Sequence, residues 1–343
     1  MLRRHADVVR AAALLVGFLL LAVLFVRLGP ARILSLLRSL GWNFLVVVAL
    51  FAAHELLRTL AIRHWLPSDP RPPVTALVRI RLLGEGAGAL TRTGSLTAEP
   101  VRAWLLANRG GQGAPGYSAA AGELMTNSAT SAALNVVVAG WALLTADLQG
   151  PLLVLAHVIL WASLVYVGVV VGILASRVSI LGASARVVGK LPLVGRRLRI
   201  DPAKVGEMER AVRSALTERP TALAYILLLE ISAQAVLVCE MYWAIRSMGV
   251  AVSLPSALFF EVMTRALTVV EFVGATEVGF AVVFTWLGMP AAIGFTLSLI
   301  KTLRSLTAGG IGVGIGVFTG GSCSNAASSP TRPPVKTVLD SAG

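Results

Sequence analysis

The chain is poor in charged residues and in the residue types that build metal sites and disulfides. Only 14% of its 343 residues are charged and 56% are hydrophobic, whereas a typical soluble domain has about 25% charged residues. The two cysteines are far apart, and one lies in an apolar run, which argues against a structural disulfide. Four scattered histidines supply no pair at metal-ligand spacing, so the sequence predicts no metal site and no cofactor.

Motifs for nucleotide hydrolysis and for nucleophilic catalysis are also missing. There is no G-x-x-x-x-G-K-[ST] phosphate loop, and no G-x-S-x-G elbow surrounds a serine. The formal net charge of +13 would suggest a nucleic-acid partner in a soluble protein. However, no face combines aromatic and basic residues in the way that stacks bases. We therefore expect no nucleic-acid partner, and the sequence indicates no catalytic residues.

Long apolar segments recur along the chain and predict an all-helical polytopic membrane protein. A run of about 20 apolar residues can cross a bilayer as a helix. The sequence predicts seven to nine membrane elements, some broken or re-entrant, in a membrane domain of residues 1–319, followed by a disordered tail, 320–343. The elements are residues 11–26 (an uncleaved first span), 41–62, 74–83, 117–148, 151–175, 221–248, 254–273, 274–288 and 290–318.

A basic segment, residues 176–220, interrupts the apolar pattern. It contains ten basic and four acidic residues. The positive-inside rule places it in the cytoplasm, and the protein is then a multi-pass protein of the cytoplasmic membrane. Membrane lipids are the expected partners, and a homo-oligomer or a cytosolic partner at the basic loop stays open. Arginine greatly outnumbers lysine, which is typical of a GC-rich bacterial genome.

The stretch from Gly84 to Arg109 places charges and helix breakers between apolar runs. Its charged residues before the last position are Glu85, Arg92, Glu99 and Arg102. Such residues are tolerated at membrane depth where they line a cavity enclosed by protein. This stretch is therefore the predicted working part of the molecule.

Two interpretations fit the residues around Glu99. In the first, Arg102 and Arg92 bind a lipid phosphate, and Glu99 orients Arg102 or meets a cationic headgroup. In the second, the same residues only start a helix. Thr97 is then the cap, Pro100 lies in the first turn, and Glu99 favours the positive end of the helix dipole.

An internal repeat appears when the chain is shifted by 178 residues against itself. Glu99 then lies over Glu277, and each follows a polar, glycine-bearing approach and precedes an apolar run. Short, interrupted hydrophobic segments at matching positions indicate a transporter site. The predicted halves are residues 42–148 and 221–318, and chance similarity between apolar sequences is the alternative.

Several ionisable residues fall inside the predicted spans and must pair or face water. Those added to the candidate headgroup site are Glu123, Glu277, Lys301 and Arg304. Arg102 or Lys301 is the expected partner of Glu123. Glu261 and Arg265, four positions apart, are expected to pair with each other.

Three charged motifs carry a family resemblance that covers residues 10–318. They are Gly94 with Glu99-Pro-Val-Arg-Ala, then Gly122-Glu123-Leu124, and Gly274-Ala-Thr-Glu277. They resemble the G-E-x-V-R-A, Glu-Arg-Leu and Pro-Gly-Gly-x-Gly-x-x-Glu segments in the membrane region of lysylphosphatidylglycerol synthases and related flippase-like proteins. Leu124 stands where that family usually has arginine, and the third motif lacks its proline.

The resemblance implies a stand-alone flippase-like protein, because no aminoacyl-transferase domain follows the last span. Such a protein would move a lipid or a lipid-linked anionic headgroup across the cytoplasmic membrane. The alternatives are an integral membrane enzyme acting on a lipid headgroup and an accessory subunit that docks a partner through the basic loop.

Overall fold

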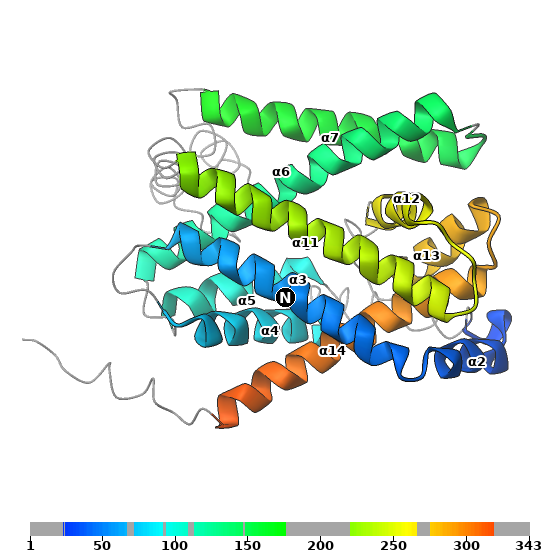
Figure 1. Ribbon diagram of the computed structural model, residues 1–343, viewed down its shortest axis with the longest axis horizontal. Helices are drawn as coiled ribbons and strands as arrows, with labels where there is room; N and C mark the ends of the chain where they lie inside the picture. The colour runs from blue at the N-terminus through cyan, green and yellow to red at the C-terminus, as the bar shows by residue number, and fades with distance from the viewer. Residues whose placement is uncertain are drawn as a thin grey trace, which may run out of the picture.

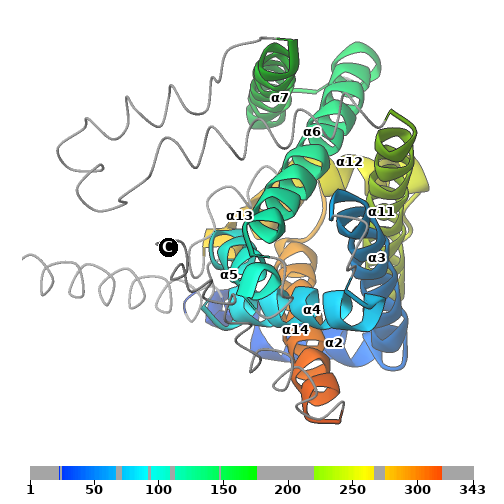
Figure 2. The same ribbon diagram turned by 90° about the vertical axis from the view of Figure 1, so that its left-hand side faces the viewer.

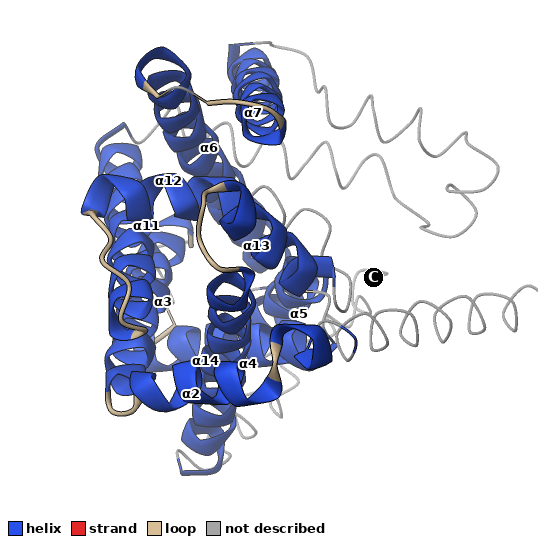
Figure 3. Cartoon of the chain, turned by 90° about the vertical axis from the view of Figure 1, so that its right-hand side faces the viewer, coloured by secondary structure: helices blue, strands red, loops and turns tan. Residues whose placement is uncertain are grey.

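In the part of the chain that the computed structural model describes, the regular elements are all helices and there is no strand (Figures 1 and 3). The predicted all-helical membrane fold is confirmed. Nearly all of the predicted first span, the loop 176–219, Arg92 and the predicted tail lie outside the described residues. The described residues are 23, 25–66, 72–91, 94–108, 113–146, 148–175, 220–265 and 275–318.

Four helices are long and apolar enough to cross a membrane. They are α3 (Asn43–Trp65), α6 (Gly113–Thr145), α7 (Pro151–Ala175) and α11 (Pro220–Ser247). On α7, Val154, Trp161 and Val165 are exposed at helical spacing. Because water would solvate such a face poorly, this surface suits the acyl chains of lipid.

The remaining helices are more polar or shorter than a typical span. They are α2 (Pro30–Leu40), α4 (Val74–Thr91), α5 (Ser95–Asn108), α12 (Leu254–Arg265), α13 (Ala275–Trp286) and α14 (Ala291–Phe318). In α2 the residue before the helix is Gly29, whose φ of 85° favours glycine, and a proline occupies the first turn.

The order of helix lengths in the first half recurs in the second half. Helices α11, α12, α13 and α14 begin 177, 180, 180 and 178 residues after α3, α4, α5 and α6, respectively. In each set, a long apolar helix precedes two short helices and a second long helix. The two sets also pack on each other, since α3 lies along α11 and α4 lies along α14 (Figures 1 and 2).

The apolar core lies where α2, α3, α11, α12, α13 and α14 meet. Its buried members include Met241 and Ile245 from α11, Phe280 and Phe284 from α13, and Leu297 from α14. The rings of Phe260 and Phe284 are tilted at 44° with centroids 5.5 Å apart, which is a favourable aromatic arrangement. This core holds the short helices beside the longer ones and so positions their charged residues.

The glycine-rich start of the Gly84–Arg109 stretch is helical, although its glycines are residues that usually disfavour a helix. Helix α4 continues through Gly84, Gly86 and Gly88 to Thr91. A Cβ on Gly86 would lie 2.7 Å from the Cα of Gly309 on α14, so the two backbones touch there. Glycine is therefore kept inside α4 for close helix contact rather than for a turn. On the α14 side of this contact, Gly309 packs against Gly86, and Gly312 packs against Leu82 and Leu83.

Candidate functional site: a charge-lined cavity

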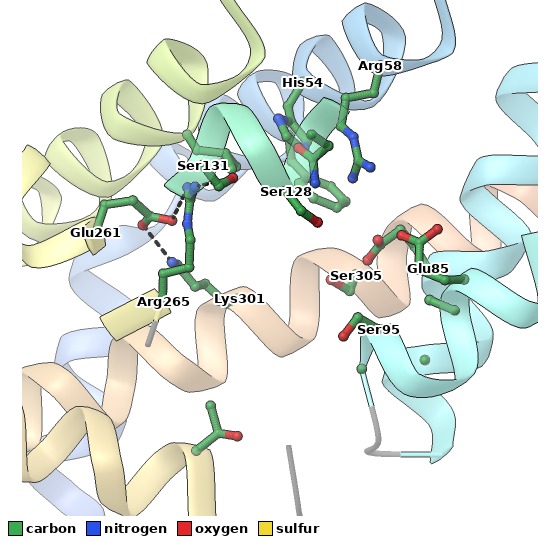
Figure 4. A pocket seen from close by; sticks show the side chains of 18 of the residues that line it. His54, Arg58, Glu85, Ser95, Ser128, Ser131, Glu261, Arg265, Lys301 and Ser305 are labelled. Carbon is green, nitrogen blue, oxygen red and sulfur yellow. Dashed lines mark hydrogen bonds and ion pairs between the residues drawn. The ribbon is translucent and has the colours of Figure 1, made fainter. Parts of the chain in front are cut away.

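A cavity of about 820 Å³ lies between the two sets of helices. Helices α3, α4, α5 and α6 contribute to its wall from the first half, and α11, α12, α13 and α14 from the second. Helix α7 adds Val158, Ser163 and Tyr166. Figure 4 shows Glu261, Arg265 and Lys301 grouped at one end and Glu85 with Ser95 at the other. The cavity is large enough for a polar headgroup.

Arg102 holds three carboxylates together at the α4–α5 end of the cavity. Its Nη1 donates to Glu99 at 2.6 Å, and its Nη2 pairs with Glu85 and lies 3.8 Å from Glu55. Gly84 allows this arrangement because the Arg102 side chain crosses α4 where any Cβ would stand. We call Arg102, Glu55, Glu85 and Glu99 the Arg102 cluster.

A second set of charges continues this cluster into the protein interior. Arg81 Nε donates to Glu55 at 2.9 Å, and its Nη1 donates to Glu123 at 3.1 Å. Arg58 pairs with the same Glu123, and its Nε lies 3.9 Å from Glu230 on α11. All of these residues are buried. Buried charges require partners because the interior solvates them poorly, so this network ties α3, α4, α6 and α11 together.

A separate polar group surrounds Glu261 at the opposite end. Its Oε1 accepts a hydrogen bond from Arg265 at 3.2 Å, and its Oε2 accepts one from Lys301 at 2.8 Å. Arg265 Nη1 also donates to the side-chain oxygen of Gln234 at 2.5 Å and to the hydroxyl of Ser131 at 3.0 Å. We call Glu261, Arg265 and Lys301 the Glu261 triad. The predicted pairing of Glu261 with Arg265 is confirmed.

Arg304 of α14 is another charged residue of the cavity wall. It pairs with Glu240 on α11, and its guanidinium lies 4.1 Å from the centre of the Phe51 ring. Both contacts hold the arginine against apolar surface while satisfying its charge. Arg304 therefore has a structural pairing as well as a place in the cavity wall.

Five predicted site residues line the cavity: Glu99, Arg102, Glu277, Lys301 and Arg304. Glu99 and Glu277, the matched pair of the internal repeat, thus lie on the same cavity, near the starts of α5 and α13. Arg92 lies outside the described residues.

Glu123 does not line the large cavity. It is 1% exposed and lies behind it, paired with Arg58 and Arg81. The expected partners, Arg102 and Lys301, were wrong, because each of them pairs with other carboxylates. The packing of α3 and α4 against α6 places Arg58 and Arg81 beside Glu123 instead.

The start of α5 differs from the predicted helix start. The helix begins at Ser95, after Gly94, whose φ of 48° lies in the left-handed region. The Gly94 carbonyl accepts hydrogen bonds from the backbone amides of Thr97 and Ala98, so Thr97 lies inside the first turn. Pro100 consequently lies in the second turn. Glycine at this position reverses the chain, which makes α4 and α5 an antiparallel hairpin.

The sequence interpretation missed several charged and polar members of the site. Arg81 and Glu55 organise the buried network, and Arg265 and Gln234 connect the Glu261 triad to α6 and α11. Arg81, Glu55 and Arg265 could have been found from the sequence, because each is an ionisable residue within an apolar run. In the described part of the chain, no group of three or more His, Cys, Asp or Glu side chains could hold a metal ion.

The fold and the cavity define a class: a polytopic helical membrane protein with a charged interior chamber. The family model for the lysylphosphatidylglycerol synthase TM region matches residues 10–312. The chain therefore belongs to the lysylphosphatidylglycerol synthase TM-region family, and the predicted family resemblance is confirmed. No curated protein and no solved structure matches the chain.

Proposed function

We propose that this protein is a translocator that moves a lipid or lipid-linked headgroup across the cytoplasmic membrane. The observation that carries the proposal is the cavity of about 820 Å³, which combines buried charges with uncharged polar side chains. A headgroup crossing a bilayer must leave water, so a polar chamber inside a membrane protein lowers the cost of that step.

The outer and inner faces of α7 support this proposal. Trp161 and Val165 are exposed and apolar, whereas Ser163 is buried and lines the cavity. One helix therefore lies between an acyl-chain environment and the charge-lined cavity. This arrangement suits a molecule whose headgroup enters the protein while its tails stay in lipid.

Family membership and the two sets of helices also favour transport over chemistry. Discontinuous short helices at matching positions in two halves are characteristic of secondary transporters. Helices α5 and α13 are such elements, and their acidic residues Glu99 and Glu277 face the same cavity. We infer that the protein changes the leaflet of its substrate and leaves the substrate's covalent structure intact.

Reconstituted vesicles that contain a trace of a fluorescent NBD lipid test this function. Dithionite reduces only the outer-leaflet dye, so a translocator raises the fraction of dye that is reduced in vesicles containing protein. Glu277→Gln keeps the side-chain shape and should slow the reaction, whereas Arg246→Gln, an exposed change outside the cavity, should not. Mass spectrometry of the recovered lipid should show an unchanged mass.

Two outcomes would contradict the proposal. If the protein converts the lipid to a product of different mass, it is an enzyme. If the wild type moves no lipid faster than protein-free vesicles across a panel of anionic, zwitterionic and sugar headgroups, it is not a headgroup translocator. A Glu277→Gln variant with the wild-type rate would exclude Glu277 from the site but leave the function standing.

A further inference from the structure

We propose that the Glu261 triad is the binding site for a phosphate-type oxyanion of the headgroup, with Lys301 and Arg265 as its ligands. This inference rests on the proposed function and deepens it. It also moves the anion from Arg102, where the sequence placed it, to the opposite end of the cavity.

The accessible charges decide which end of the cavity attracts an anion. At the α4–α5 end, Glu85 and Glu99 are the accessible side chains, at 23% and 17%, while Arg102 is only 5% exposed beneath them. At the other end the order is reversed, since Lys301 and Arg265 are 21% and 18% exposed and Glu261 is 5% exposed. A headgroup therefore meets carboxylates at one end and cations at the other.

The other arginines in the cavity wall are less suited to bind an anion. Arg58, Arg102 and Arg304 have exposed fractions of 8%, 5% and 10%, and each is paired with at least one buried or half-buried carboxylate. Drawing one of them to a ligand would leave a carboxylate without its counter-ion at a cost of several kcal/mol. In the Glu261 triad two cations contact one carboxylate, so a ligand that draws one cation away leaves the other paired with Glu261.

Lys301 has donor capacity beyond its bond to Glu261. An ammonium group carries three N–H donors, and Glu261 accepts one of them at 2.8 Å. Lys301 also lies 5.4 Å from the centre of the Phe280 ring, which limits the positions of its flexible side chain. Glu261 and Phe280 thus hold the ammonium in place while leaving donors for an oxyanion.

Arg265 is fixed by an extended polar chain. Gln234 accepts from Arg265 through its oxygen and donates through its nitrogen to Asn127 at 3.1 Å and to Ser131 at 2.9 Å. The Gln234 side-chain amide thus links polar side chains of α6, α11 and α12 by hydrogen bonds and holds Arg265 in position before any ligand enters. Preorganised donors bind an oxyanion better than mobile ones because less conformational entropy is lost.

Uncharged polar residues extend from this end across the cavity wall. Ser128 on α6 and Ser305 on α14 line it. Among the described residues neither has a hydrogen-bond partner, and the buried side-chain oxygen of Asn135 also has none. These groups can bind hydroxyl or ester oxygens of the same headgroup along the cavity, with Ser305 on the side of Glu85 and Ser95 (Figure 4). Phosphate-type oxyanions suit the site because they accept bonds from several converging donors at once.

The transport test compares two fluorescent lipids that differ in whether they carry phosphate. One is NBD-phosphatidylglycerol, which has a phosphodiester, and the other is NBD-glucosylceramide, which has none. Lys301→Gln and Arg265→Gln should lower the initial rate for the phosphodiester lipid at least about tenfold, because charge-assisted hydrogen bonds are the strong ones. Lys301→Arg, which keeps the charge, should retain most of the rate.

The control and the folding check use the same chain. Arg246→Gln removes an exposed positive charge outside the cavity and should leave both rates unchanged. A glutamine at position 301 can still donate to Glu261, so the variant is expected to fold and to elute like the wild type. If Lys301→Gln and the wild type move the phosphodiester lipid equally fast, the subsite is wrong while the proposed function stands.

A binding test identifies the source of the oxyanion and does not depend on transport. Thermal unfolding in detergent is followed with inorganic phosphate against chloride, and then with phosphatidylglycerol in the micelles. Stabilisation by inorganic phosphate that is lost in Lys301→Gln indicates a site for the free ion. Stabilisation by the lipid alone, also lost in Lys301→Gln, indicates a lipid phosphate.

Equal stabilisation of the wild type and Lys301→Gln by either ligand, or no stabilisation by both, overturns the inference. If no lipid crosses with the wild type but phosphate stabilises it through Lys301, the proposed function fails and the subsite remains. A loss of transport in Lys301→Gln that is equally large for the sugar lipid would also refute a phosphate-specific role.

Discussion

Arg81 is the residue whose removal should most clearly expose the energetics of the buried network. Its side chain is 2% exposed and bridges Glu55 at 2.9 Å and Glu123 at 3.1 Å. In Arg81→Met an apolar side chain of similar length replaces the cation. Glu55 then loses its nearest cationic partner, and Glu123 loses one of its two. Glu55 then has Arg102 at 3.8 Å, and Glu123 has Arg58.

The expected cost follows from the state of the two carboxylates. Removing one partner of a buried ion pair costs about 3–5 kcal/mol, mainly because a charge stays buried without compensation. Because Arg102 and Arg58 compensate in part, we expect about 3 kcal/mol for Arg81→Met. Arg81→Lys keeps the charge but loses the fork that reaches two carboxylates, so about 1–2 kcal/mol is expected.

Arg79 supplies a matched control two residues away on the same helix. It is half-buried and has no carboxylate within ion-pair distance among the described residues. Arg79→Met removes the same charge from α4 and should cost less than about 1 kcal/mol, because no carboxylate among the described residues loses an ion-pair partner.

The assay is reversible unfolding in mixed micelles by increasing mole fraction of sodium dodecyl sulfate, followed by the fluorescence of the seven tryptophans. A double variant, Arg81→Met with Glu55→Met, should cost less than the sum of the two single changes by about 0.5–3 kcal/mol. Equal costs for Arg81→Met and Arg79→Met, or strict additivity in the double variant, would refute the reasoning.

Two further perturbations test the close packing and the Arg102 cluster. Gly309→Ala should destabilise the fold by about 1–3 kcal/mol because its Cβ would strike the backbone of Gly86. Gly310→Ala, next in the chain and facing open space, should be neutral or stabilising by up to about 1 kcal/mol in the same titration; the opposite order would disprove the α4–α14 contact. Arg102→Gln should lower the free energy of unfolding by about 3–5 kcal/mol, since three carboxylates lose their shared cation. Adding Glu99→Gln, which removes a carboxylate whose ion pair in the described structure is with Arg102, should recover part of that loss, and a further loss would contradict the assignment of the cluster.

Much of the helix order could be predicted from the apolar pattern. The predicted spans 151–175 and 221–248 correspond to α7 and α11 within one residue at each end. Such segments are predictable because a lipid environment permits few alternatives to a helix whose backbone hydrogen bonds are all internal. The α4 glycines were misinterpreted, since a glycine used for helix contact and a glycine used for a turn look the same without the neighbouring helix.

The candidate site could be predicted only in part, and Glu123 shows why. Its burial and its need for a partner follow from a charge placed in an apolar run. Its actual partners, Arg58 and Arg81, are 65 and 42 positions away and come from two different helices. Local spacing can suggest pairs within one helix, such as Glu261 with Arg265, but carries no information about how helices pack.

The sequence by itself determined that this chain is a helical membrane protein, that charges lie at membrane depth, and that its two halves have matching interrupted segments. These properties depend on composition and short-range periodicity. The tertiary structure alone decided which charges pair and which stay accessible. It left Glu85 and Glu99 facing one end of the cavity and Lys301 and Arg265 facing the other. The reason is that a side chain's exposure and its ionic partner are set by the helices packed around it, which come from distant parts of the chain.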